Sequence, residues 1–294
     1  MKKRKYLILG VNGMAGHIIA QYLKEKGHTV LGFARKKSPI CETFTGDARQ
    51  RDDVKGLLEE TARYDVIVNC IGILNKQVDA KPSDGIYLNS VFPHLLAEKL
   101  DGSGTKLIHI SSDCIYEGTR GSYTESEFPD AVSYYGRTKA LGEIIDGQNL
   151  TIRTSIVGPE LKSSGIGLFH WFINQEGFVE GYKNVIWSGV TTLQLAKAIE
   201  EDLTKQQTGL YHLVNNKTIN KHDLLKLFNS ICRRYPVEIR KNFSVVSDRS
   251  IINTQNDPAF CVPDYEQMVH EMADWIKEHH ELYHQYGETM QWER

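Results

Sequence analysis

The 294-residue sequence has no long apolar run and no excess of charge of either sign. A membrane-spanning helix needs about 20 consecutive apolar residues, and no run in this chain approaches that length. The formal net charge is −2 and the pI is near 6.6, which argues against the broad basic surface that binds nucleic acid. We therefore expect neither a membrane nor a nucleic acid among the partners.

The sequence also lacks a regular cysteine pattern. Its five cysteines are an odd number at irregular spacing and include no C-x-x-C pair. They therefore indicate neither a disulfide framework nor a zinc site. A reducing compartment, the cytoplasm, is the expected location. The histidines at 279, 280 and 284 lie on a polar terminal helix with no nearby set of carboxylates and cysteines, so we expect them to be solvent-exposed and we predict no metal.

The first ten residues, MKKRKYLILG, superficially resemble a signal peptide. Their apolar run covers only residues 6–9, which is shorter than the roughly 7–15 residues of a signal-peptide core. A buried strand is the better interpretation.

The first half of the chain alternates short apolar runs with segments of helical periodicity. Such alternation is typical of a doubly wound α/β fold of the Rossmann type, with a parallel sheet, helices on both faces, and ligands at the carboxyl ends of the strands. Pro93 should kink its helix or shift its start. The expected strands are 6–10, 28–33, 65–72, 105–112 and 149–158, and the expected helices are 14–26, 51–64, 83–100 and 133–145.

Beyond residue 158 the pattern loosens into a smaller lobe. Helices are expected at 165–176, 191–204, 220–233 and 264–285, and a strand at 209–214. We expect an NADP-binding domain of residues 1–157 plus about 187–214. A substrate-binding lobe would take about 158–186 and 215–294.

The segment GVNGMAG carries Gly10, Gly13 and Gly16 between the first expected strand and helix. The first glycine allows a tight turn, the second lets backbone N–H groups approach a pyrophosphate, and the third permits close packing of helix on strand. Three ordinary turn glycines are the alternative. Their position after the first strand is the context that a dinucleotide site requires, so we predict one here.

The end of the second strand discriminates between cofactors. An acid there would bind the ribose of NAD, whereas an arginine accommodates the 2′-phosphate of NADP. The segment GFARKKS offers Arg35, Lys36 and Lys37 and no acid. NADPH is favoured, NADH stays open, and a solvated basic loop is the alternative.

Two further segments are expected along the cofactor. Asp47, followed by Ala48, comes after an expected third strand, where its carboxylate could accept from the adenine amino group or cap the next helix. The small residues of NCIG, 69–72, suit a backbone surface against a cofactor as well as tight core packing.

The spacing Y-x-x-x-K occurs twice, and context separates the two instances. Tyr22 and Lys26 lie in the first expected helix, where a cation in the last turn suits the helix dipole. Tyr135 and Lys139 begin the helix after SSDCIY, beside the glycine turn in a doubly wound sheet. Residues four apart share a helix face. The lysine ammonium would favour the phenolate of Tyr135, and Ser112 could bond the same substrate oxygen.

The chain resembles the extended short-chain dehydrogenases/reductases, and within them the dTDP-4-dehydrorhamnose reductase group. The residues that carry the resemblance span about 6 to 215, with a weaker echo in DRSIIN, 248–253. They read GVNGMAG, NCIG, YLNSVFPHLLAE, SSDCIYEG, YGRTKALGE, IRTSIVGP, TTLQLAKAI and GLYHLVN.

This resemblance implies roles for individual residues. Ser112, Tyr135 and Lys139 would form the catalytic triad, and Lys139 would also hold the nicotinamide ribose. Asn89 would help to position the active-site helix, or would serve only as an internal helix cap. The pyrophosphate would contact Gly13, Met14 and Ala15, and the cofactor would run along Cys70, Ile71 and Gly72.

One departure bears on the chemistry. Related nucleotide-sugar dehydratases carry an Asp-Glu pair after the catalytic hydroxyl, but Asp113 is followed here by Cys114. The missing glutamate disfavours elimination chemistry, and Cys114 is expected to be a buried, inert thiol.

Substrate contacts are expected at Ser112 and Asp113, and further along the chain at Thr191 and Arg249. Thr191 suits a helix cap equally well, and Arg249 could pair with a diphosphate or be solvated. The aromatic residues of GLFHWFINQEG, 167–177, suit either a nucleotide base or the core.

The resulting expectation is NADPH-dependent reduction of the C4 ketone of a nucleotide-linked 4-keto-6-deoxy sugar for surface polysaccharide biosynthesis. The partner is the nucleotide sugar, and a homodimer stays open. The alternatives are an epimerase or dehydratase that retains NAD, and a non-catalytic NADP-binding regulatory subunit.

Overall fold

The computed structural model describes residues 2–203, 207–255 and 260–291. Its strands are β1 Lys5–Leu9, β2 Thr29–Ala34, β3 Thr43–Thr45, β4 Val66–Asn69, β5 Lys106–Ile110, β6 Leu150–Arg153, β7 Ile156–Val157, β8 Phe178–Tyr182, β9 Val185–Trp187, β10 Val190–Thr191, β11 Gly209–His212, β12 Ile219–Asn220, β13 Glu238–Asn242 and β14 Ser247–Asp248. Its α-helices are α1 Met14–Glu25, α2 Arg51–Glu60, α3 Asn75–Ala80, α4 Pro82–Gly85, α5 Phe92–Leu100, α6 Tyr134–Leu141, α7 Leu168–Ile173, α8 Thr192–Ala198, α10 Lys221–Ile231 and α11 Tyr265–Glu278.

A seven-stranded parallel sheet forms the larger part of the molecule, in the order β11-β6-β5-β4-β1-β2-β3. The chain order reverses between β1 and β4, so the loops after these strands diverge and leave a crevice at their carboxyl ends. The expected doubly wound α/β fold is confirmed, and the glycine-rich segment lies at this switch point.

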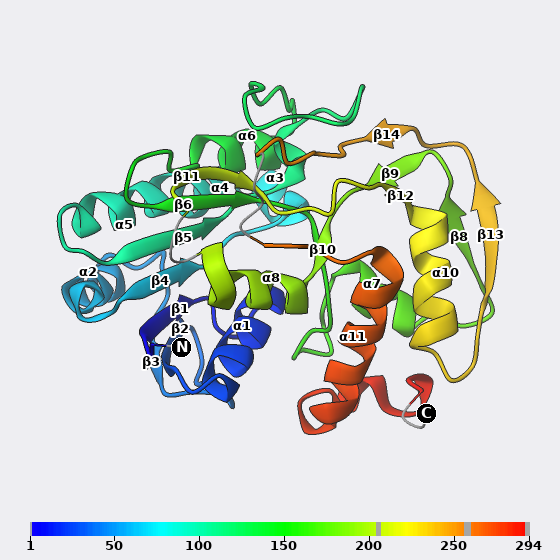
Figure 1. Cartoon of the computed structure of the whole chain (residues 1–294), viewed down its shortest axis with the longest axis horizontal. Coiled ribbons are helices and arrows are strands. Elements are labelled where there is room, and N and C mark those ends of the chain that lie inside the picture. The colour runs from blue at the N-terminus through cyan, green and yellow to red at the C-terminus, as the bar shows by residue number, and fades with distance from the viewer. Residues whose placement is uncertain (1, 204–206, 256–259, 292–294) are drawn as a thin grey trace.

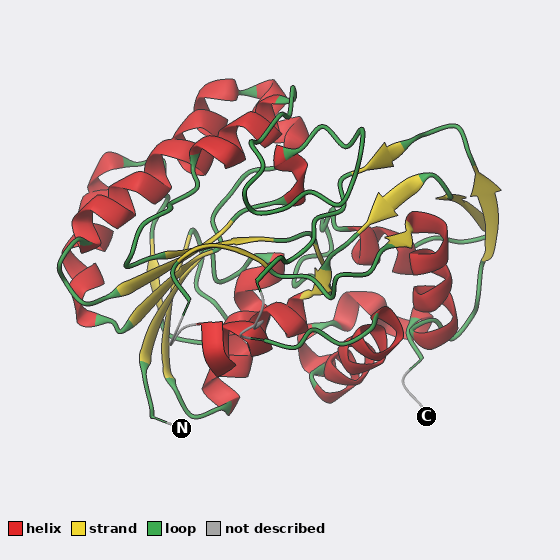
Figure 2. Cartoon of the chain, turned by 45° about the horizontal axis from the view of Figure 1, so that its top comes forward, coloured by secondary structure: helices red, strands yellow, loops and turns green. Residues whose placement is uncertain are grey.

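Helices cover both faces of the sheet, as Figures 1 and 2 show. Alternate residues of β1 point to opposite faces. Tyr6 and Ile8 join the core that includes α1, α8 and α11, whereas Leu7 and Leu9 join the core under α2 and α5. All four side chains are at most 2% exposed. Each such burial contributes roughly 1.5–3 kcal/mol, which explains why a near-continuous apolar run encodes this strand.

The second lobe lies on the right of Figure 1 and carries α7, α10 and three small sheets. Strand β9 sits between β12 and β14 in one sheet, β8 pairs with β13 in another, and β7 pairs with β10 in the third. The chain returns from this lobe through β11, which adds to the edge of the main sheet beside β6. The division into two domains at the expected boundaries stays a prediction.

The expected strand 149–158 is interrupted. Strand β6 belongs to the main sheet, whereas β7 pairs with β10 in the second lobe. Thr154 lies at the break, where its hydroxyl donates to the carbonyl of Leu213 at 2.9 Å. The chain therefore passes between the two sheets at Thr154, whose side chain adds a hydrogen bond to the segment after β11.

The expected helix 83–100 is confirmed as three pieces rather than one. Helix α4 passes into a π-helical turn at Ile86–Val91, and α5 then begins with Pro93 in its first turn. Proline has no N–H and is tolerated there, and the helical run continues through Pro93 from Pro82 to Leu100, so Pro93 does not shift its start.

The expected helix 264–285 ends early, at Glu278, and short 3₁₀ turns follow. The expectation that the terminal histidines are solvent-exposed is wrong for His279. Its ring is 8% exposed and stacks on Trp275 with centroids 4.0 Å apart, and its Nε2 lies 2.6 Å from a Glu25 carboxylate oxygen.

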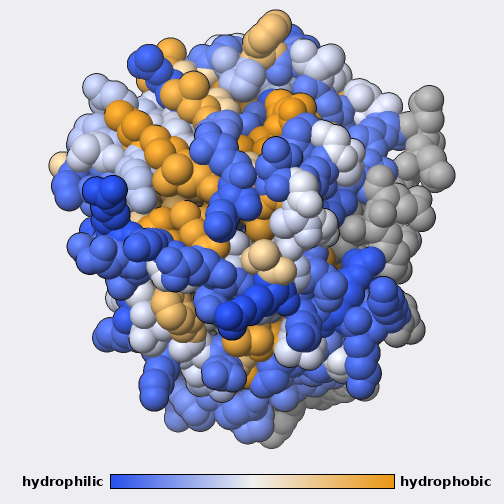
Figure 3. Space-filling view, turned by 90° about the vertical axis from the view of Figure 1, so that its left-hand side faces the viewer, coloured by the Kyte–Doolittle hydropathy of each residue, from blue (hydrophilic) through white to orange (hydrophobic). Residues whose placement is uncertain are grey.

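The surface of the main-sheet side is mixed. Figure 3 shows an apolar patch among charged residues on the left-hand face of the molecule. Exposed apolar side chains include Leu141 at 67% and Ile145 at 64%. The homodimer stays a prediction. None of the helices in the described part of the chain is long and apolar enough to span a membrane.

Candidate functional site

The glycine-rich turn is held in a conformation that only glycine fits. Gly10 has a φ of +81°, and its N–H donates to the carbonyl of Phe33 at 2.8 Å. A Cβ on Gly16 would lie 2.3 Å from the carbonyl oxygen of Gly10, so the first turn of α1 packs directly on this turn. These are the roles that sequence reasoning assigned to the first and third glycines.

The N-terminus of α1 offers free backbone donors. Gly13 caps the helix without a side-chain hydrogen bond, and the first turn, which begins with Met14 and Ala15, contains no acid. Unpaired N–H groups at the start of a helix favour an anion. The residues therefore fit the pyrophosphate of a dinucleotide, which is the group this cradle would hold.

The basic loop after β2 lies beside this turn. Asn12 donates from Nδ2 to the carbonyl of Lys36 at 2.8 Å, which ties the glycine-rich turn to the loop. Arg35 is exposed there. A 2′-phosphate would meet the guanidinium of Arg35 next to the helix N-terminus, so the residues present fit NADPH.

Asp47 is engaged with Arg49 rather than with a helix end. The Arg49 guanidinium lies 2.6 Å from the Asp47 carboxylate, and this hydrogen bond holds the pKa of Asp47 below its usual range. The cap of α2 is Gln50, so the helix-cap alternative for Asp47 is wrong. Ala48 beside it is 5% exposed. Adenine contacts at these two residues stay a prediction.

The segment after β4 lies against the glycine turn. A Cβ on Gly10 would lie 3.2 Å from the carbonyl oxygen of Cys70. The N–H of Ile71 donates to Asn69 Oδ1 at 3.1 Å, and a Cβ on Gly72 would lie 3.3 Å from Asn89 Oδ1. The structure thus brings Cys70, Ile71 and Gly72 to the same crevice as Gly10.

Helix α6 is short and closely packed. Ser133 caps it by accepting from the N–H of Gly136 at 3.1 Å. A Cβ on Gly136 would lie 2.2 Å from the carbonyl oxygen of Cys114, so the helix backbone touches the turn that follows Ser112. The expected helix 133–145 ends at Leu141 with Gly142 as its C-cap. A Cβ on Gly142 would lie 1.8 Å from the carbonyl oxygen of Asn89, so only glycine fits at this position.

Ser112 and Tyr135 meet through this contact. Ser112 accepts from the N–H of Cys114 at 3.0 Å and donates to Asp113 Oδ1 at 3.2 Å. Its hydroxyl is close enough to the Tyr135 phenol to act on the pKa of that phenol, in the lowering direction. Burial raises the pKa of Tyr135, and the neighbouring Cys114 thiol adds to this shift. Lys139 was expected to lower the pKa of Tyr135, but without a bound cofactor the pKa is not lowered. The phenol therefore keeps its proton at neutral pH, as a proton donor must.

Lys139 lies 4% exposed on the same helix. Its Nζ donates to the carbonyl oxygen of Ile110 at 2.6 Å and lies 3.5 Å from Nε2 of His109. Burial lowers the pKa of Lys139 to about 8. The contact with His109 was not foreseen, because a histidine inside a strand reads as an ordinary core residue.

Asn89 ties α6 to the segment after β4. Its Oδ1 accepts from the N–H of Ile73 at 3.0 Å, and its Nδ2 donates to Thr138 Oγ1 at 3.2 Å. Thr138 stands between Tyr135 and Lys139, so these contacts fit a positioning role for Asn89. The π-helical turn that carries Asn89 is a feature often found at functional sites.

A buried ion pair between Glu143 and Arg153 lies next to the site. Both oxygens of Glu143 bond Arg153, each at 2.7 Å, and Ser111 donates to Glu143 at 2.7 Å. Arg153 also donates to the hydroxyl of Tyr116 at 2.8 Å. The side chains of Glu143 and Arg153 are 4% and 3% exposed. Sequence reasoning missed this pair, although Glu143 is four residues beyond Lys139.

The four expected substrate residues fall into two groups. Ser112 and Asp113 lie at the α6 contact. Arg249 lies close by, since its Nε donates to the carbonyl of Tyr116 at 2.9 Å. Thr191 is 1% exposed and caps α8 by accepting from the N–H of Gln194, so the structure shows the helix-cap alternative.

Lys221 is a residue that sequence reasoning missed. It opens α10 in the second lobe, with its Nζ 5.0 Å from the centroid of the Trp187 ring. Burial lowers the pKa of Lys221 to about 8, and the Asp113 carboxylate, with Cys114 beside it, acts on it in the opposite direction. Lys221, from the other lobe, therefore lies within electrostatic reach of the Ser112 turn.

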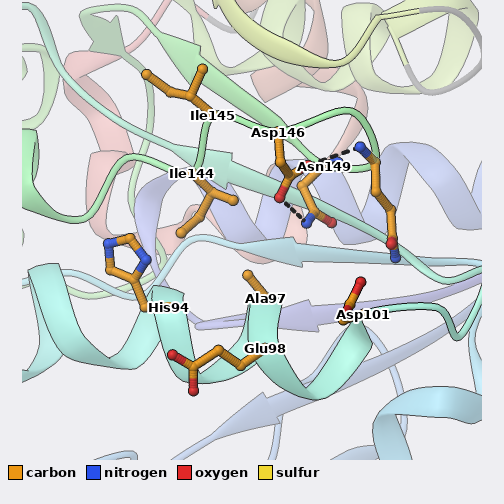
Figure 4. Close-up of a pocket in the computed structure, with 9 residues that line it drawn as sticks. His94, Ala97, Glu98, Asp101, Ile144, Ile145, Asp146 and Asn149 are labelled. Atoms are coloured by element: carbon orange, nitrogen blue, oxygen red, sulfur yellow. Dashed lines mark hydrogen bonds between the residues drawn. The ribbon is translucent and has the colours of Figure 1, made fainter.

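A cavity of about 440 Å³ lies apart from these residues (Figure 4). It is lined by His94, Ala97, Glu98, Asp101, Ile144, Ile145, Asp146, Gln148 and Asn149. None of the residues discussed for the cofactor or the Ser112 turn borders it, so it is not the candidate site.

Two further expectations concern the cysteines and metals. Burial raises the pKa of the Cys114 thiol to about 12, which accords with an inert group. Within residues 2–203, 207–255 and 260–291, no group of three or more His, Cys, Asp or Glu side chains is arranged to hold a metal ion. The absence of a metal in the functional protein stays a prediction.

The fold and the crevice together define a class. A parallel sheet with a glycine turn at its switch point and a tyrosine–lysine helix beside it is the Rossmann-like fold of the extended short-chain dehydrogenases/reductases. Residues 4–286 match the model of the RmlD substrate-binding domain, and the chain belongs to this family.

Two relatives of this sequence have different functions. The probable low-salt glycan biosynthesis reductase Agl14 of Haloferax volcanii is 31% identical over 142 residues, 46% of each chain. The beta subunit of methionine adenosyltransferase 2 from Xenopus tropicalis is 30% identical over 245 residues, 75% of this chain and 70% of the relative. The match spans about half the length of the first relative.

Among solved structures, the dTDP-4-dehydrorhamnose reductase of Bacillus anthracis, in complex with NADP, superposes with a TM-score of 0.76 at 18% identity. The superposition covers 92% of this chain and 98% of that structure. At this identity the likeness establishes the fold.

Proposed function

We propose that this protein reduces the C4 ketone of a nucleotide-linked 4-keto-6-deoxy sugar with NADPH, for surface polysaccharide biosynthesis. The proposal is more specific than membership of the family. Members of the family act on nucleotide sugars or share the fold of enzymes that do. It assigns Ser112, Tyr135 and Lys139 to the reaction.

The observation that carries the proposal is the packing of Gly136 on the carbonyl oxygen of Cys114, which brings Tyr135 to the Ser112 turn. It brings a hydroxyl and a neutral proton donor to one point at the carboxyl edge of the sheet. The crevice of Gly10 and Cys70, which would hold the cofactor, is at the same edge. A carbonyl oxygen at that point would be within reach of both groups, which is the arrangement that general acid catalysis requires.

The residues of the chain have distinct tasks in this reaction. NADPH held at the glycine turn would supply a hydride for the carbonyl carbon. Tyr135 donates its proton to the carbonyl oxygen, which becomes the alcohol, and Ser112 orients that oxygen through its hydroxyl. Lys139 stabilises the phenolate that remains until solvent returns the proton.

The first alternative is an epimerase or dehydratase that retains NAD. The thiol at position 114 disfavours it, because a thiol whose pKa is raised to about 12 does not exchange protons near neutral pH. The second alternative is a non-catalytic NADP-binding subunit. The resemblance to a methionine adenosyltransferase beta subunit favours it, over a longer stretch than the match to Agl14.

Absorbance at the reduced-nicotinamide band tests the proposal. The protein would be mixed with NADPH and with 4-keto-6-deoxy sugars carried on dTDP, UDP or GDP, beside a Tyr135→Phe variant. We expect NADPH loss with one sugar and a fall of roughly 10²–10⁴-fold in the variant. Tight NADPH binding without turnover on any sugar would instead support the regulatory subunit.

A further inference from the structure

Three buried side chains form a row from β4 to α6. Asn69, His109 and Lys139 are 0%, 0% and 4% exposed. Nδ2 of Asn69 lies 3.2 Å from Nδ1 of His109, and Nε2 of His109 lies 3.5 Å from Nζ of Lys139. The row therefore ends on the lysine assigned to the cofactor and to Tyr135.

The direction of the hydrogen bonds follows from the amide of Asn69. Its Oδ1 accepts from the N–H of Ile71 at 3.1 Å, so the amide cannot be turned around without setting two donors face to face. Nδ2 therefore donates to Nδ1 of His109. A ring nitrogen that accepts a hydrogen bond carries no proton, and in a neutral imidazole the other nitrogen carries it. The ring thus presents Nε2–H to Lys139.

This orientation opposes a charged lysine. An ammonium has three donors and no acceptor, so it would face the ring N–H donor against donor. A neutral amine has a lone pair that accepts from Nε2–H, while one of its own N–H groups donates to the carbonyl of Ile110 at 2.6 Å. The amine form satisfies both contacts.

The other groups around Lys139 do not supply a free negative charge. Glu143, the carboxylate four residues on, is occupied by Arg153 and Ser111. Burial raises the pKa of the Cys70 thiol to about 12, and the Tyr135 phenol is also held in its neutral form. Burial lowers the pKa of His109 most strongly, and the nearby Lys139 and His94 lower it further, so the ring is uncharged. Consistently, the pKa of Lys139 is lowered to about 8.

We infer that His109 is a positioning residue that keeps Lys139 as a neutral amine in mildly alkaline solution, and that NADPH binding is coupled to uptake of a proton at Lys139. The phosphates of NADPH bring negative charge to the crevice and favour the ammonium. The proton comes from solvent and forms an N–H bond at Nζ. The inference rests on the proposed function in that NADPH is the ligand of the glycine turn.

Calorimetry of NADPH binding in buffers of different ionisation enthalpy measures this proton. A group with a pKa of about 8 is about three-quarters unprotonated at pH 8.5, so we expect uptake approaching that fraction per site. At pH 7 the uptake at Lys139 should be about a tenth of a proton. The 2′-phosphate, with a pKa near 6, contributes little at pH 8.5.

Variants test whether the proton is taken up at Lys139, in the row with Asn69 and His109. Lys139→Met should bind NADPH without uptake at pH 8.5. His109→Phe keeps an aromatic ring but loses the N–H, so the uptake should fall at least twofold because the ammonium forms before binding. Lys221→Gln removes the other site lysine with a lowered pKa, and His170→Gln alters a buried histidine of the second lobe. Both should leave the uptake unchanged.

The outcomes separate the inference from the proposed function. Binding without uptake by the wild type, or uptake that persists in Lys139→Met, overturns the inference and leaves the cofactor assignment intact. Absence of NADPH binding overturns both. A titration of the ¹³Cε signal of Lys139 in the unliganded wild type needs no folded His109 variant. A midpoint near 8 supports the inference, and one near the ordinary 10.5 overturns it.

Discussion

Gly136 and Cys114 touch through their backbones: a Cβ on Gly136 would lie 2.2 Å from the carbonyl oxygen of Cys114. The two residues come from different elements, the helix that carries Tyr135 and the turn that follows Ser112. The absence of a side chain at Gly136 therefore sets the distance between the proposed proton donor and the hydroxyl that orients the substrate.

Gly136→Ala should damage both stability and activity. The added methyl group cannot fit against a backbone carbonyl, so α6 must move away from the Ser112 turn. We expect a loss of about 1–3 kcal/mol in the free energy of unfolding and a large fall in kcat. Gly147 has no atom within 4 Å of its Cβ position, so Gly147→Ala serves as the control. Denaturant unfolding of both variants, with kcat alongside, checks the prediction, which fails if the two variants behave alike.

Arg35→Ser should weaken NADPH binding and leave NADH binding unchanged. The guanidinium is exposed beside the glycine-rich turn, where it would meet the 2′-phosphate that NADH lacks. A charge-assisted hydrogen bond contributes about 1.5–3 kcal/mol, and the exposure of Arg35 favours the lower end, so Kd for NADPH should rise about tenfold. Fluorescence titration with each cofactor measures the ratio. Arg51→Ser, an exposed arginine on α2, should change neither affinity. An equal loss for NADPH and NADH would contradict the assignment.

Glu143→Gln should destabilise the fold beneath the site. It leaves the Arg153 guanidinium buried without its carboxylate partner, and such a loss costs about 3–5 kcal/mol. The exposed pair of Glu238 and Arg240 is the comparison, since both side chains are more than half exposed. Glu238→Gln should leave the unfolding midpoint in denaturant unchanged. A Glu143 variant as stable as the wild type would mean that the ion pair contributes no net stability.

Lys221→Gln should raise KM for the nucleotide sugar without changing Kd for NADPH. Lys221 is close enough to the Ser112 turn for Asp113 to act on its pKa, and its own charge would attract an anionic substrate. We expect KM to rise by roughly one order of magnitude, in line with a hydrogen bond to a charged group. Lys217→Gln, an exposed lysine nearby in the sequence, should leave KM unchanged.

The same lysine predicts a pH dependence. With a pKa lowered to about 8, Lys221 is charged below that pH and loses its charge as the pH rises through it. KM of the wild type should therefore increase above pH 8, whereas KM of Lys221→Gln should stay flat over that range. Parallel profiles for the two proteins would show that Lys221 does not bind the substrate.

Much of the site could be predicted because its signals are local. Gly10, Gly13 and Gly16 stand where a strand passes into a helix, and a positive φ or a close backbone approach selects glycine whatever the rest of the fold does. The four-residue spacing of Tyr135 and Lys139 fixes a shared helix face in the same way. Apolar runs determined the strands of the main sheet, because burial on both faces leaves no polar position.

Only the tertiary structure decided what these local elements touch. Three such contacts are the approach of Gly136 to Cys114, the effect of the Ser112 turn on Lys221 of the second lobe, and the hydrogen-bond row through His109. They join residues whose separation in the chain ranges from 22 positions to more than 100. No periodicity encodes such pairs, since they follow from how whole elements pack. The protonation of Tyr135 shows the consequence: its spacing from Lys139 suggested a lowered pKa, but burial, a property of the packed molecule, raises it.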